Sequence, residues 1–343
     1  MEPNKHLAAY AALGHLNGKP AISRRNLLVW WVTTGMFPGI SVAQDLSSKP
    51  VRLMVGVPPG GSNDFAARLI APYLGEALGT TVIVENKVGA AGTIATDFVA
   101  KSAPDGTTLY FGGTGPILIA PQAMPKVPFN FLSDITPINM VGETPLAIAV
   151  SPALGVKTLQ EFIALSRSRP LSLGSTGTGG LPHLVIESLI QSSRGNILHV
   201  PYKGGGPAIN DALGGHVSGV VQDVPTFIPF HEQGKLIILA VTSAKRVDFL
   251  PNIQTVNEVL PDFFGATSSL GLYAPARTPK PIIDKINSAL MKAVAHDDFR
   301  ARLLKAGIVP VTMASPDAFQ KATVEEYHRW GKLLRQKGIV ITN

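Results

Sequence analysis

The stretch from Pro58 to Asp64 has the residue types that bind anions through the backbone. It reads Pro-Pro-Gly-Gly-Ser-Asn-Asp and follows Val51–Val57, a run that is apolar apart from Arg52 and is typical of a buried strand. From Phe65 onward, apolar residues recur at helical spacing. A strand, a glycine turn and a helix start bring unpaired N–H groups and a positive dipole end to one point, which suits a carboxylate or a phosphate. The alternative is an ordinary connection in which Asp64 is only a helix cap or a first-turn residue.

Known catalytic motifs do not occur elsewhere in the sequence. There is no G-x-S-x-G serine and no G-x-x-x-x-G-K-[ST] phosphate loop, and Gly177-Thr-Gly179 begins a dinucleotide motif that fails at Pro182. His231-Glu232 lacks the second histidine of a zinc protease, and the histidines beyond residue 43 show no short ligand spacing. We therefore expect no catalytic residue, cofactor or metal. An enzyme whose catalytic groups meet only in space remains the alternative.

Composition and charge narrow the class of protein further. The chain has 343 residues, which suggests two domains, and 45% hydrophobic with 15% charged residues is typical of a globular core. The absence of cysteine excludes disulfides, thiolate metal sites and a cysteine lipid anchor. The formal charge is +7, but the basic residues are scattered and lack interleaved aromatic residues, so we do not expect nucleic-acid binding.

Residues 1–43 have the features of an export signal. A polar segment ends at Ser23-Arg24-Arg25, a moderately apolar run covers Asn26–Ile40, and Ser41-Val-Ala43 is a small-x-small cleavage site. The run is short and broken for a membrane span, although an N-terminal anchor is the alternative. The paired arginines resemble the twin-arginine motif, and general secretory export stays open. We expect cleavage after Ala43.

The mature chain alternates strands and helices in two sets. A βαβαβ pattern predicts a parallel sheet with right-handed crossovers, and glycine turns follow its strands at the edge where open α/β sheets bind ligands. An extended segment, 137–150, leads to the second set, and 268–274 is expected to return to the first. The predicted strands are 51–57, 81–85, 108–112, 171–174, 197–202, 217–221 and 236–241, and the predicted helices are 64–78, 92–102, 158–167, 183–193, 207–213, 279–295, 297–306 and 316–336.

The order of motifs resembles the Bug (TctC-type) extracytoplasmic receptors of tripartite tricarboxylate transporters. The resemblance covers residues 49–343. It rests on Pro59–Arg68, Val84–Gly92, Ala103–Leu109, Gly174–His183, His199–Gly204, Asp211–Gly215, Ala240–Arg246, Leu250–Val256, Ala274–Pro279 and Trp330–Lys332. It implies the α/β, periplasmic-binding-protein type II-like fold, with two lobes that each hold a mainly parallel sheet and are joined by two crossing strands. Lobe I would comprise residues 49–148 plus 270–343, and lobe II residues 149–269.

The resemblance also implies a function. Such a receptor is periplasmic, acts as a monomer and holds a small mono-, di- or tricarboxylate between the lobes for membrane permease subunits. Carried over by position, the ligand-binding residues are Gly60, Gly61, Ser62, Asn63, Thr114, Gly115, Ser175, Thr176, Gly177, Thr178, Gly180, His183 and Asp223. Other readings are a secreted α/β enzyme of unassigned reaction, or a receptor that acts in signalling without a dedicated transporter.

Three departures from the family pattern leave the identity of the carboxylate open. Asn63 stands where threonine is common, Gln222-Asp-Val-Pro225 replaces Phe-Asp-Asn-x-Pro, and Thr114-Gly-Pro116 lacks the serine-rich form. Asp223 is expected to face the cleft, where it orients water or accepts a hydrogen bond from an amino or ring-nitrogen group. A buried structural carboxylate is the alternative.

Overall fold

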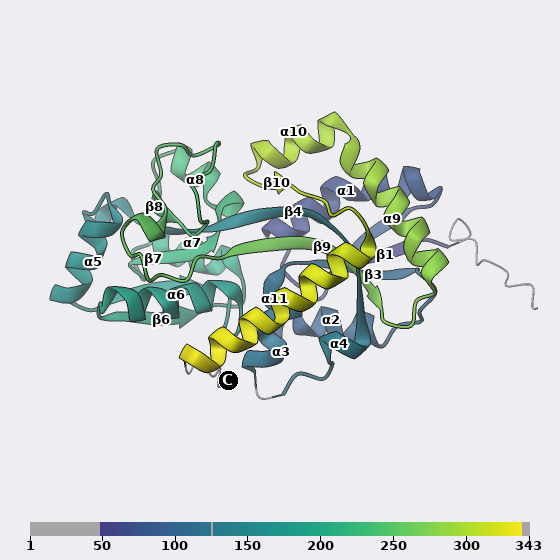
Figure 1. Ribbon diagram of the computed structural model, residues 1–343. Coiled ribbons are helices and arrows are strands. Elements are labelled where there is room, and N and C mark those ends of the chain that lie inside the picture. Colours follow the sequence, from purple (N-terminus) through teal and green to yellow (C-terminus); the bar gives the residue numbers. More distant parts are fainter. Residues whose placement is uncertain (1–48, 125, 338–343) are drawn as a thin grey trace, which may run out of the picture. The chain divides into compact units, whose positions relative to one another are not determined.

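The computed structural model describes residues 49–124 and 126–337, which all belong to one compact unit, Ala43–Asn343 (Figure 1). The predicted leader, residues 1–43, lies outside the described residues, so the export signal and its cleavage site remain predictions. Among the described helices, none is both long enough and apolar enough to cross a membrane.

Three parallel strands form the first sheet, as the sequence predicts. Strand β1 (Val51–Val55) lies between β2 (Val82–Asn86) and β3 (Thr108–Gly112). Helix α1 (Ser62–Leu78) connects β1 to β2, and α2 (Thr93–Ala100) connects β2 to β3. Both connections are therefore βαβ units, which direct the starts of α1 and α2 to the carboxyl edge of the sheet.

The pleat of β1 explains how this sheet is covered on both faces. Val51, Leu53 and Val55 pack with α1, whereas Met54 belongs to the core on the opposite face, because successive strand residues point to opposite sides. The helices α9 (Lys280–Ala295) and α10 (Asp297–Lys305) lie with α1 on the first face. Helix α11 (Pro316–Lys337) lies with α2 on the second.

A second sheet has the same parallel arrangement. Its strands are β5 (Leu171–Ser175), β6 (Ile197–Pro201), β7 (Gly219–Asp223) and β8 (Ile237–Val241), and β5 pairs in parallel with both β6 and β7. Its helices are α5 (Leu159–Ser168), α6 (Leu181–Ser193), α7 (Gly205–Leu213) and α8 (Ile228–Glu232). Strand β7 was predicted two residues too early, and the correct bounds make Asp223 its last residue.

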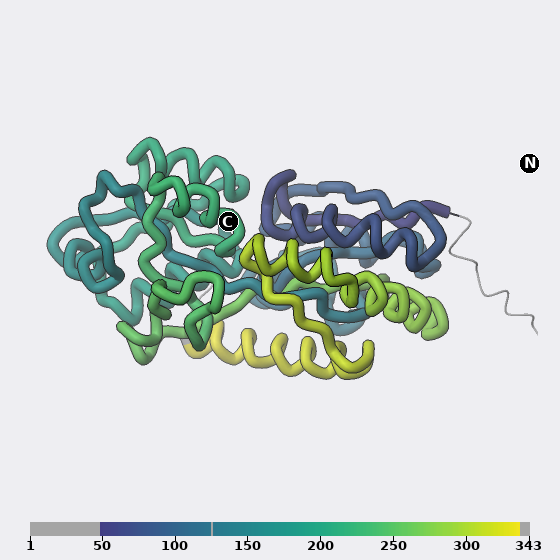
Figure 2. The backbone as a smooth tube through the Cα atoms, turned by 90° about the horizontal axis from the view of Figure 1, so that it is seen from above, coloured from purple at the N-terminus to yellow at the C-terminus, as the bar shows by residue number. Residues whose placement is uncertain are grey.

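Two strands connect the sheets (Figures 1 and 2). Strand β4 (Ile135–Val150) pairs antiparallel with β9 (Thr267–Pro275) over its first part, and with β7 and β8 over its last five residues. Strand β9 returns the chain to the first sheet, where it also pairs with β3 and where β10 (Val309–Pro310) pairs with β4. The two crossings predicted from the sequence are therefore confirmed.

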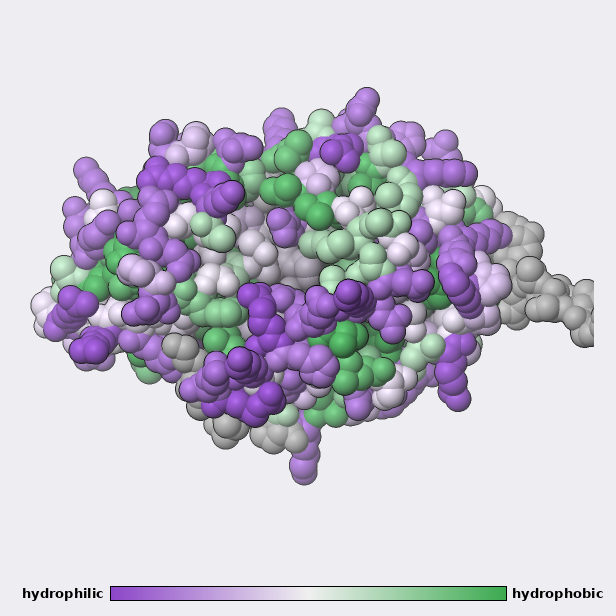
Figure 3. Space-filling model, in the orientation of Figure 1, coloured by the Kyte–Doolittle hydropathy of each residue, from purple (hydrophilic) through white to green (hydrophobic). Residues whose placement is uncertain are grey.

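The segment between β3 and β4 contains helical turns that the sequence analysis did not predict. They are a π-helical turn, η3 (Gly115–Ile119), followed by α3 (Ala120–Ala123) and α4 (Phe131–Asp134). Each turn is too short to show a helical period, although η3 buries Ile117, Leu118 and Ile119 completely or almost so. In the view of Figure 3, apolar side chains on the surface form small scattered patches between hydrophilic ones.

Candidate functional site

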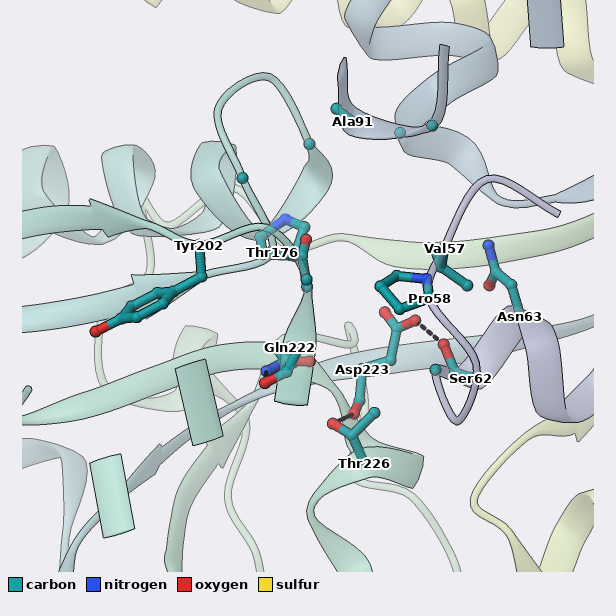
Figure 4. Close-up of a pocket in the computed structure, with 18 of the residues that line it drawn as sticks. Val57, Pro58, Ser62, Asn63, Ala91, Thr176, Tyr202, Gln222, Asp223 and Thr226 are labelled. Carbon is teal, nitrogen blue, oxygen red and sulfur yellow. Dashed lines mark hydrogen bonds between the residues drawn. The ribbon is translucent and has the colours of Figure 1, made fainter. Parts of the chain in front are cut away.

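A cavity of about 970 Å³ lies where the carboxyl ends of the two sheets face each other. Its walls are the turns after β1, β2 and β3 of the first sheet, and the turns after β5, β6 and β7 of the second. Figure 4 shows side chains from both sheets around it. The predicted contact residues among its lining are Gly60, Gly61, Ser62, Asn63, Gly115, Thr176, Gly177, Thr178, Gly180 and Asp223.

Three of the predicted contact residues lie behind the lining instead. Thr114 is buried, and its Oγ1 lies 2.9 Å from Ser269 Oγ and accepts a hydrogen bond from the Ser269 amide. Ser175 is fully buried, with Oγ 2.6 Å from His199 Nε2, and His183 is buried below the turn that follows β5. The structure therefore places these residues where they support the turns that line the cavity.

The start of α1 leaves fewer free amides than the sequence suggests. The Gly60 amide donates to Asp64 Oδ2 at 2.9 Å, and the Gly61 amide donates to the Pro58 carbonyl oxygen at 3.2 Å. The next amides, of Ser62 and Asn63, have no partner inside the helix, because the first N–H groups of an α-helix lie beyond the reach of its own carbonyls. The anion-binding donors of this turn are accordingly those of α1 itself, with the positive end of the helix dipole behind them.

Asp64 has a structural role as a first-turn residue of α1 and does not cap the helix, whose N-cap is Gly61. Its carboxylate accepts hydrogen bonds from the Gly60 amide, Arg68 and Asn86, with donor distances of 2.8–3.0 Å. Burial alone would raise the pKa of this carboxyl, but the hydrogen bonds from Arg68, the Gly60 amide and Asn86 outweigh it and lower the pKa. An ionised Asp64 therefore fixes the glycine turn against the helix.

Asp223 points into the cavity from the end of β7 (Figure 4). Its Oδ2 accepts a short hydrogen bond from the hydroxyl of Ser62, so a residue of the second sheet is joined to the start of α1. Burial raises the pKa of the Asp223 carboxyl to about 6, and the Ser62 hydroxyl acts in the opposite direction. Figure 4 shows this hydrogen bond, which directly joins a side chain of one cavity wall to a side chain of the other.

A cluster of two histidines and a glutamate lies behind the turn after β5, and the sequence analysis missed it. The rings of His183 and His199 stack with centroids 3.9 Å apart, and His183 Nε2 lies 3.4 Å from Glu187 Oε1. The Gly179 amide donates to His183 Nδ1 at 3.3 Å. Burial is the largest of the causes that together lower the pKa of His199 to about 4; the electrostatic interaction with His183 acts in the same direction and Glu187 acts against both, so His199 is neutral at pH 7. The i, i+4 spacing of His183 and Glu187 on one helix was the available signal.

The cluster offers three side chains of metal-ligand types whose ligand atoms lie within 4.8 Å of one another, but its geometry fits hydrogen bonding better. Because His183 Nδ1 accepts from Gly179, its proton lies on Nε2, the atom that faces Glu187. The two rings are within 17° of parallel, so their in-plane lone pairs do not converge on one ion. The cluster therefore braces the turn that lines the cavity, holding Gly179 directly and Ser175 through His199.

Replacing His183 tests this brace. We expect His183→Phe to retain an aromatic ring against His199 but to leave the Gly179 amide without its acceptor, which costs about 1–3 kcal/mol for a buried donor. The loop then relaxes, and ligand affinity falls about tenfold, measured by isothermal titration calorimetry. Glu187→Gln, which leaves the Gly179 bond in place, is the matched control. Unchanged affinity in His183→Phe would show that the loop needs no brace.

The two sheets, which β4 joins into one ten-stranded sheet, carry glycine turns that enclose a cavity, and this arrangement defines a solute-binding receptor. The chain belongs to the tripartite tricarboxylate transporter family receptor (TctC) family, whose profile matches residues 66–339. The resemblance to Bug receptors inferred from the motifs is thereby confirmed. This is a family of periplasmic receptors rather than of enzymes.

Relatives of known sequence or structure agree over most of the chain. BugT of Bordetella pertussis strain Tohama I is 32% identical over 313 residues, which cover 90% of this chain and 95% of BugT. The periplasmic binding protein BugD has a TM-score of 0.80 at 32% identity, covering 85% of this chain and 98% of BugD.

Two similar structures were solved with ligands. Rpa4515 of R. palustris, with adipate, has a TM-score of 0.80 at 30% identity and covers 85% of this chain and 98% of its own. MatC of Rhodopseudomonas palustris, with bound malate, has a TM-score of 0.77 at 29% identity, and the match covers 83% of this chain and 98% of MatC.

Proposed function

We propose that this protein is a periplasmic receptor that holds a small carboxylate in the cavity between its two sheets and delivers it to a tripartite tricarboxylate-type transporter. The observation that carries the proposal is the convergence of the α1 start and the turn after β5 on one cavity. The relatives solved with adipate and with malate support a carboxylate as the ligand.

The donors proposed for the carboxylate are backbone amides on both walls. The first wall supplies those of Ser62 and Asn63, at the positive end of α1. On the second wall the Gly177 and Gly179 amides are already bonded, to Ser175 Oγ and His183 Nδ1, so Thr176 and Thr178 are the proposed donors. Charge-assisted bonds of this kind are short and strong, particularly in a site that excludes water.

Binding of this kind involves a hinge. We assign residues 49–148 plus 270–343 to lobe I and residues 149–269 to lobe II. The chain crosses between them near Pro145, where β4 changes from one set of partners to the other, and at Ala266, just before β9. Movement at these crossings would open and close the cavity around the ligand.

The proposed receptor is exported and acts as a monomer. A leader that is cleaved after Ala43 carries the receptor to the periplasm, and the monomer presents its ligand to the membrane permease subunits of the transporter. A size measurement on the mature protein would test the monomer, and N-terminal sequencing of protein recovered from the periplasm would test the cleavage site.

The function is tested by titrating the purified protein with a panel of mono-, di- and tricarboxylates while its melting temperature is followed. A true ligand at 100 times its dissociation constant should add roughly 3 kcal/mol to the free energy of unfolding. Loss of the added ligand with time would instead indicate an enzyme. A panel that stabilises nothing would reject the carboxylate receptor.

Two substitutions at Ser62 separate the backbone donor from the side chain. Ser62 is the first residue of α1, where proline is tolerated, so Ser62→Pro should remove the N–H with little loss of stability. Affinity for carboxylates should fall about tenfold, as expected for one charge-assisted hydrogen bond. Ser62→Ala keeps the N–H and loses only the bond to Asp223, so the difference between the two variants measures the backbone donor. Equal affinities, measured by calorimetry, would argue against the assignment of the α1 start.

A further inference from the structure

Helix α11 contacts both of the assigned lobes, although its own residues belong to lobe I. Its first half packs within lobe I, where the ring centroids of Phe319 and Tyr273 on β9 are 5.6 Å apart. Its last turns lie beside lobe II, as Figures 1 and 2 both show. There the ring of Trp330 meets the ring of Phe264 edge to face, with centroids 4.8 Å apart. The helix therefore bridges the two halves of the receptor.

Phe264 lies next to one of the two crossings between the lobes. It precedes Ala266, where the chain leaves lobe II for β9, by two positions. Its amide donates to Ser188 Oγ at 3.0 Å, and the Asp262 carbonyl oxygen accepts from Ser192 Oγ, so this segment is fixed to α6. The start of α6 follows the glycine turn after β5, which lines the cavity. A contact at Phe264 therefore acts on the hinge and, through α6, on the second cavity wall.

The same end of α11 is fixed to the first cavity wall. Gln122 of α3 donates from Nε2 to the carbonyl oxygen of Tyr327 at 2.7 Å. A Cβ atom on Gly331 would lie 2.0 Å from Gln122 Oε1, so α3 packs this closely against α11 only because a glycine is there. The adjoining turn η3 supplies Gly115 and Pro116 to the cavity lining. Helix α11 therefore connects both walls, while none of its described residues lines the cavity.

The contact between Trp330 and Phe264 is reinforced by a cation. Trp330 is fully buried and Phe264 is half-buried, and the Arg329 guanidinium lies 5.4 Å from the Phe264 ring centroid and 5.7 Å from that of Trp330. Glu326 accepts two hydrogen bonds from Arg329, at 2.7 and 2.8 Å, which fix the guanidinium in place. Edge-to-face and cation–π pairs are favourable only while the groups keep this geometry. The contact therefore favours the hinge angle of this structure over others.

The indole N–H of Trp330 has no acceptor among the described residues, although the side chain is fully buried. A buried tryptophan N–H usually has a partner, because an unmet donor costs free energy. This cost offsets part of the packing between the rings. Such a balance suits a contact that is made and broken more than it suits a permanent part of the core.

At the hinge angle of this structure the two cavity walls touch. The Ser62 hydroxyl reaches Asp223 across the cavity, and Gly204 lies so close to Pro58 that a Cβ atom would clash. The α11 contact is therefore formed together with a closed arrangement of the lobes. A contact that is weaker in the open arrangement raises the closed population, and ligand affinity rises in proportion to that population.

Resting on the proposed receptor function and its two lobes, we propose that α11 locks the hinge. Trp330 holds residues 261–266 in the position that brings the two cavity walls together. Trp330 and Phe264 are thus positioning residues for ligand binding, although neither of them lines the cavity.

Matched substitutions at Phe264 test the lock by isothermal titration calorimetry. The probe is the acid among succinate, malate, adipate, citrate and benzoate that raises the melting temperature of the parent protein most. Phe264→Leu keeps an apolar side chain but removes the ring, and should lower affinity about 5- to 50-fold, within the usual range of coupling between distant sites. Phe264→Tyr, which keeps the ring, should bind within about threefold of the parent.

Tyr327→Leu is the control for a purely structural role. It removes a half-buried ring from α11 whose partner, Phe131 on α4, also belongs to lobe I, so this contact is the same at every hinge angle. The variant should lose stability to urea much as Phe264→Leu does, and should keep the affinity of the parent. An equal loss of affinity in both leucine variants, or no loss in Phe264→Leu, would overturn the lock while leaving the carboxylate receptor intact.

Small-angle X-ray scattering of the ligand-free proteins tests the lock without any ligand. Phe264→Leu should have a larger radius of gyration than the parent protein, and Tyr327→Leu should not. Equal radii for the three proteins would reject the lock even where a carboxylate binds. If the radii differ as expected but none of the acids binds, the lock stands and the carboxylate function fails.

Discussion

Gly204→Ala is expected to hold the cavity open and to lower the affinity for every carboxylate ligand by at least about tenfold. Gly204 precedes α7 with φ of +135°, a backbone conformation that is essentially confined to glycine. A Cβ atom there would lie 2.7 Å from Cγ of Pro58, which belongs to the turn of the first sheet on the opposite wall. Because a proline ring cannot rotate away, the two turns must separate.

Two further variants distinguish this effect from backbone strain. Gly155 has φ of +80°, and a Cβ atom added there would have no other atom within 4 Å. Gly155→Ala therefore carries only a conformational cost of about 1–2 kcal/mol and should bind ligand as the parent does. Adding Pro58→Ala to Gly204→Ala removes the Cγ and Cδ atoms that clash, and part of the affinity should return. If Gly204→Ala alone binds normally in calorimetry, the ligand-bound receptor does not bring these two turns together.

The elements that the sequence predicted well are those with a long, unambiguous period. The apolar positions of α1 recur over 17 residues and also form the interface with β1, so local preference and tertiary packing agree. Segment 137–150, predicted as extended chain between the two sets, likewise corresponds to β4, which is buried and pairs on both sides. Errors are concentrated at ends, as at β7, and in helical turns too short to show a period, such as η3.

The cavity-lining turns were predicted because glycine turns at strand ends follow from the βαβ pattern. Which amides within a turn are free could not be predicted, since it depends on side chains that return to the backbone. Asp64 takes the Gly60 amide, and His183 takes that of Gly179. Nothing in the sequence spacing distinguishes a histidine that contacts ligand from one that supports the loop.

The histidine cluster shows a second reason why the site could not be fully predicted from the sequence, namely the register of the paired strands. His199 meets Ser175 because β6 pairs with β5 in the register that sets His199 opposite Leu173 and Pro201 opposite Ser175. The residues concerned are 24 positions apart in the chain. A shift of one residue would turn the histidine to the other face of the sheet, and the local sequence does not fix that register.

Asp223→Asn should stabilise the ligand-free protein at neutral pH, although it removes a hydrogen-bonded carboxylate from the site. Burial raises the folded-state pKa of Asp223 to about 6 from its ordinary 3.8, so the folded state holds this proton more tightly than the unfolded state does. Between those two values, stability falls as pH rises, and above about pH 6 the ionised carboxylate imposes its full cost. The amide escapes this cost, worth about 1–3 kcal/mol at pH 7.5.

Urea unfolding of the two proteins between pH 4 and pH 8 measures the effect. The advantage of Asp223→Asn should be near zero at pH 4, should grow as pH rises to 6 and should then stay constant. His199, with its pKa of about 4, titrates in both proteins, so its contribution cancels in the difference.

Asp64→Asn is the control of opposite sign. The pKa of Asp64 is lowered in the fold, so its charged form stabilises the protein above its ordinary pKa, and that contribution is lost as pH falls through the lower folded value. At pH 7.5 this variant should therefore be less stable than the parent, while Asp223→Asn is more stable. If both variants lose stability at pH 7.5, the prediction for Asp223 is wrong. The ionised Asp223 would then stabilise the ligand-free fold instead of destabilising it.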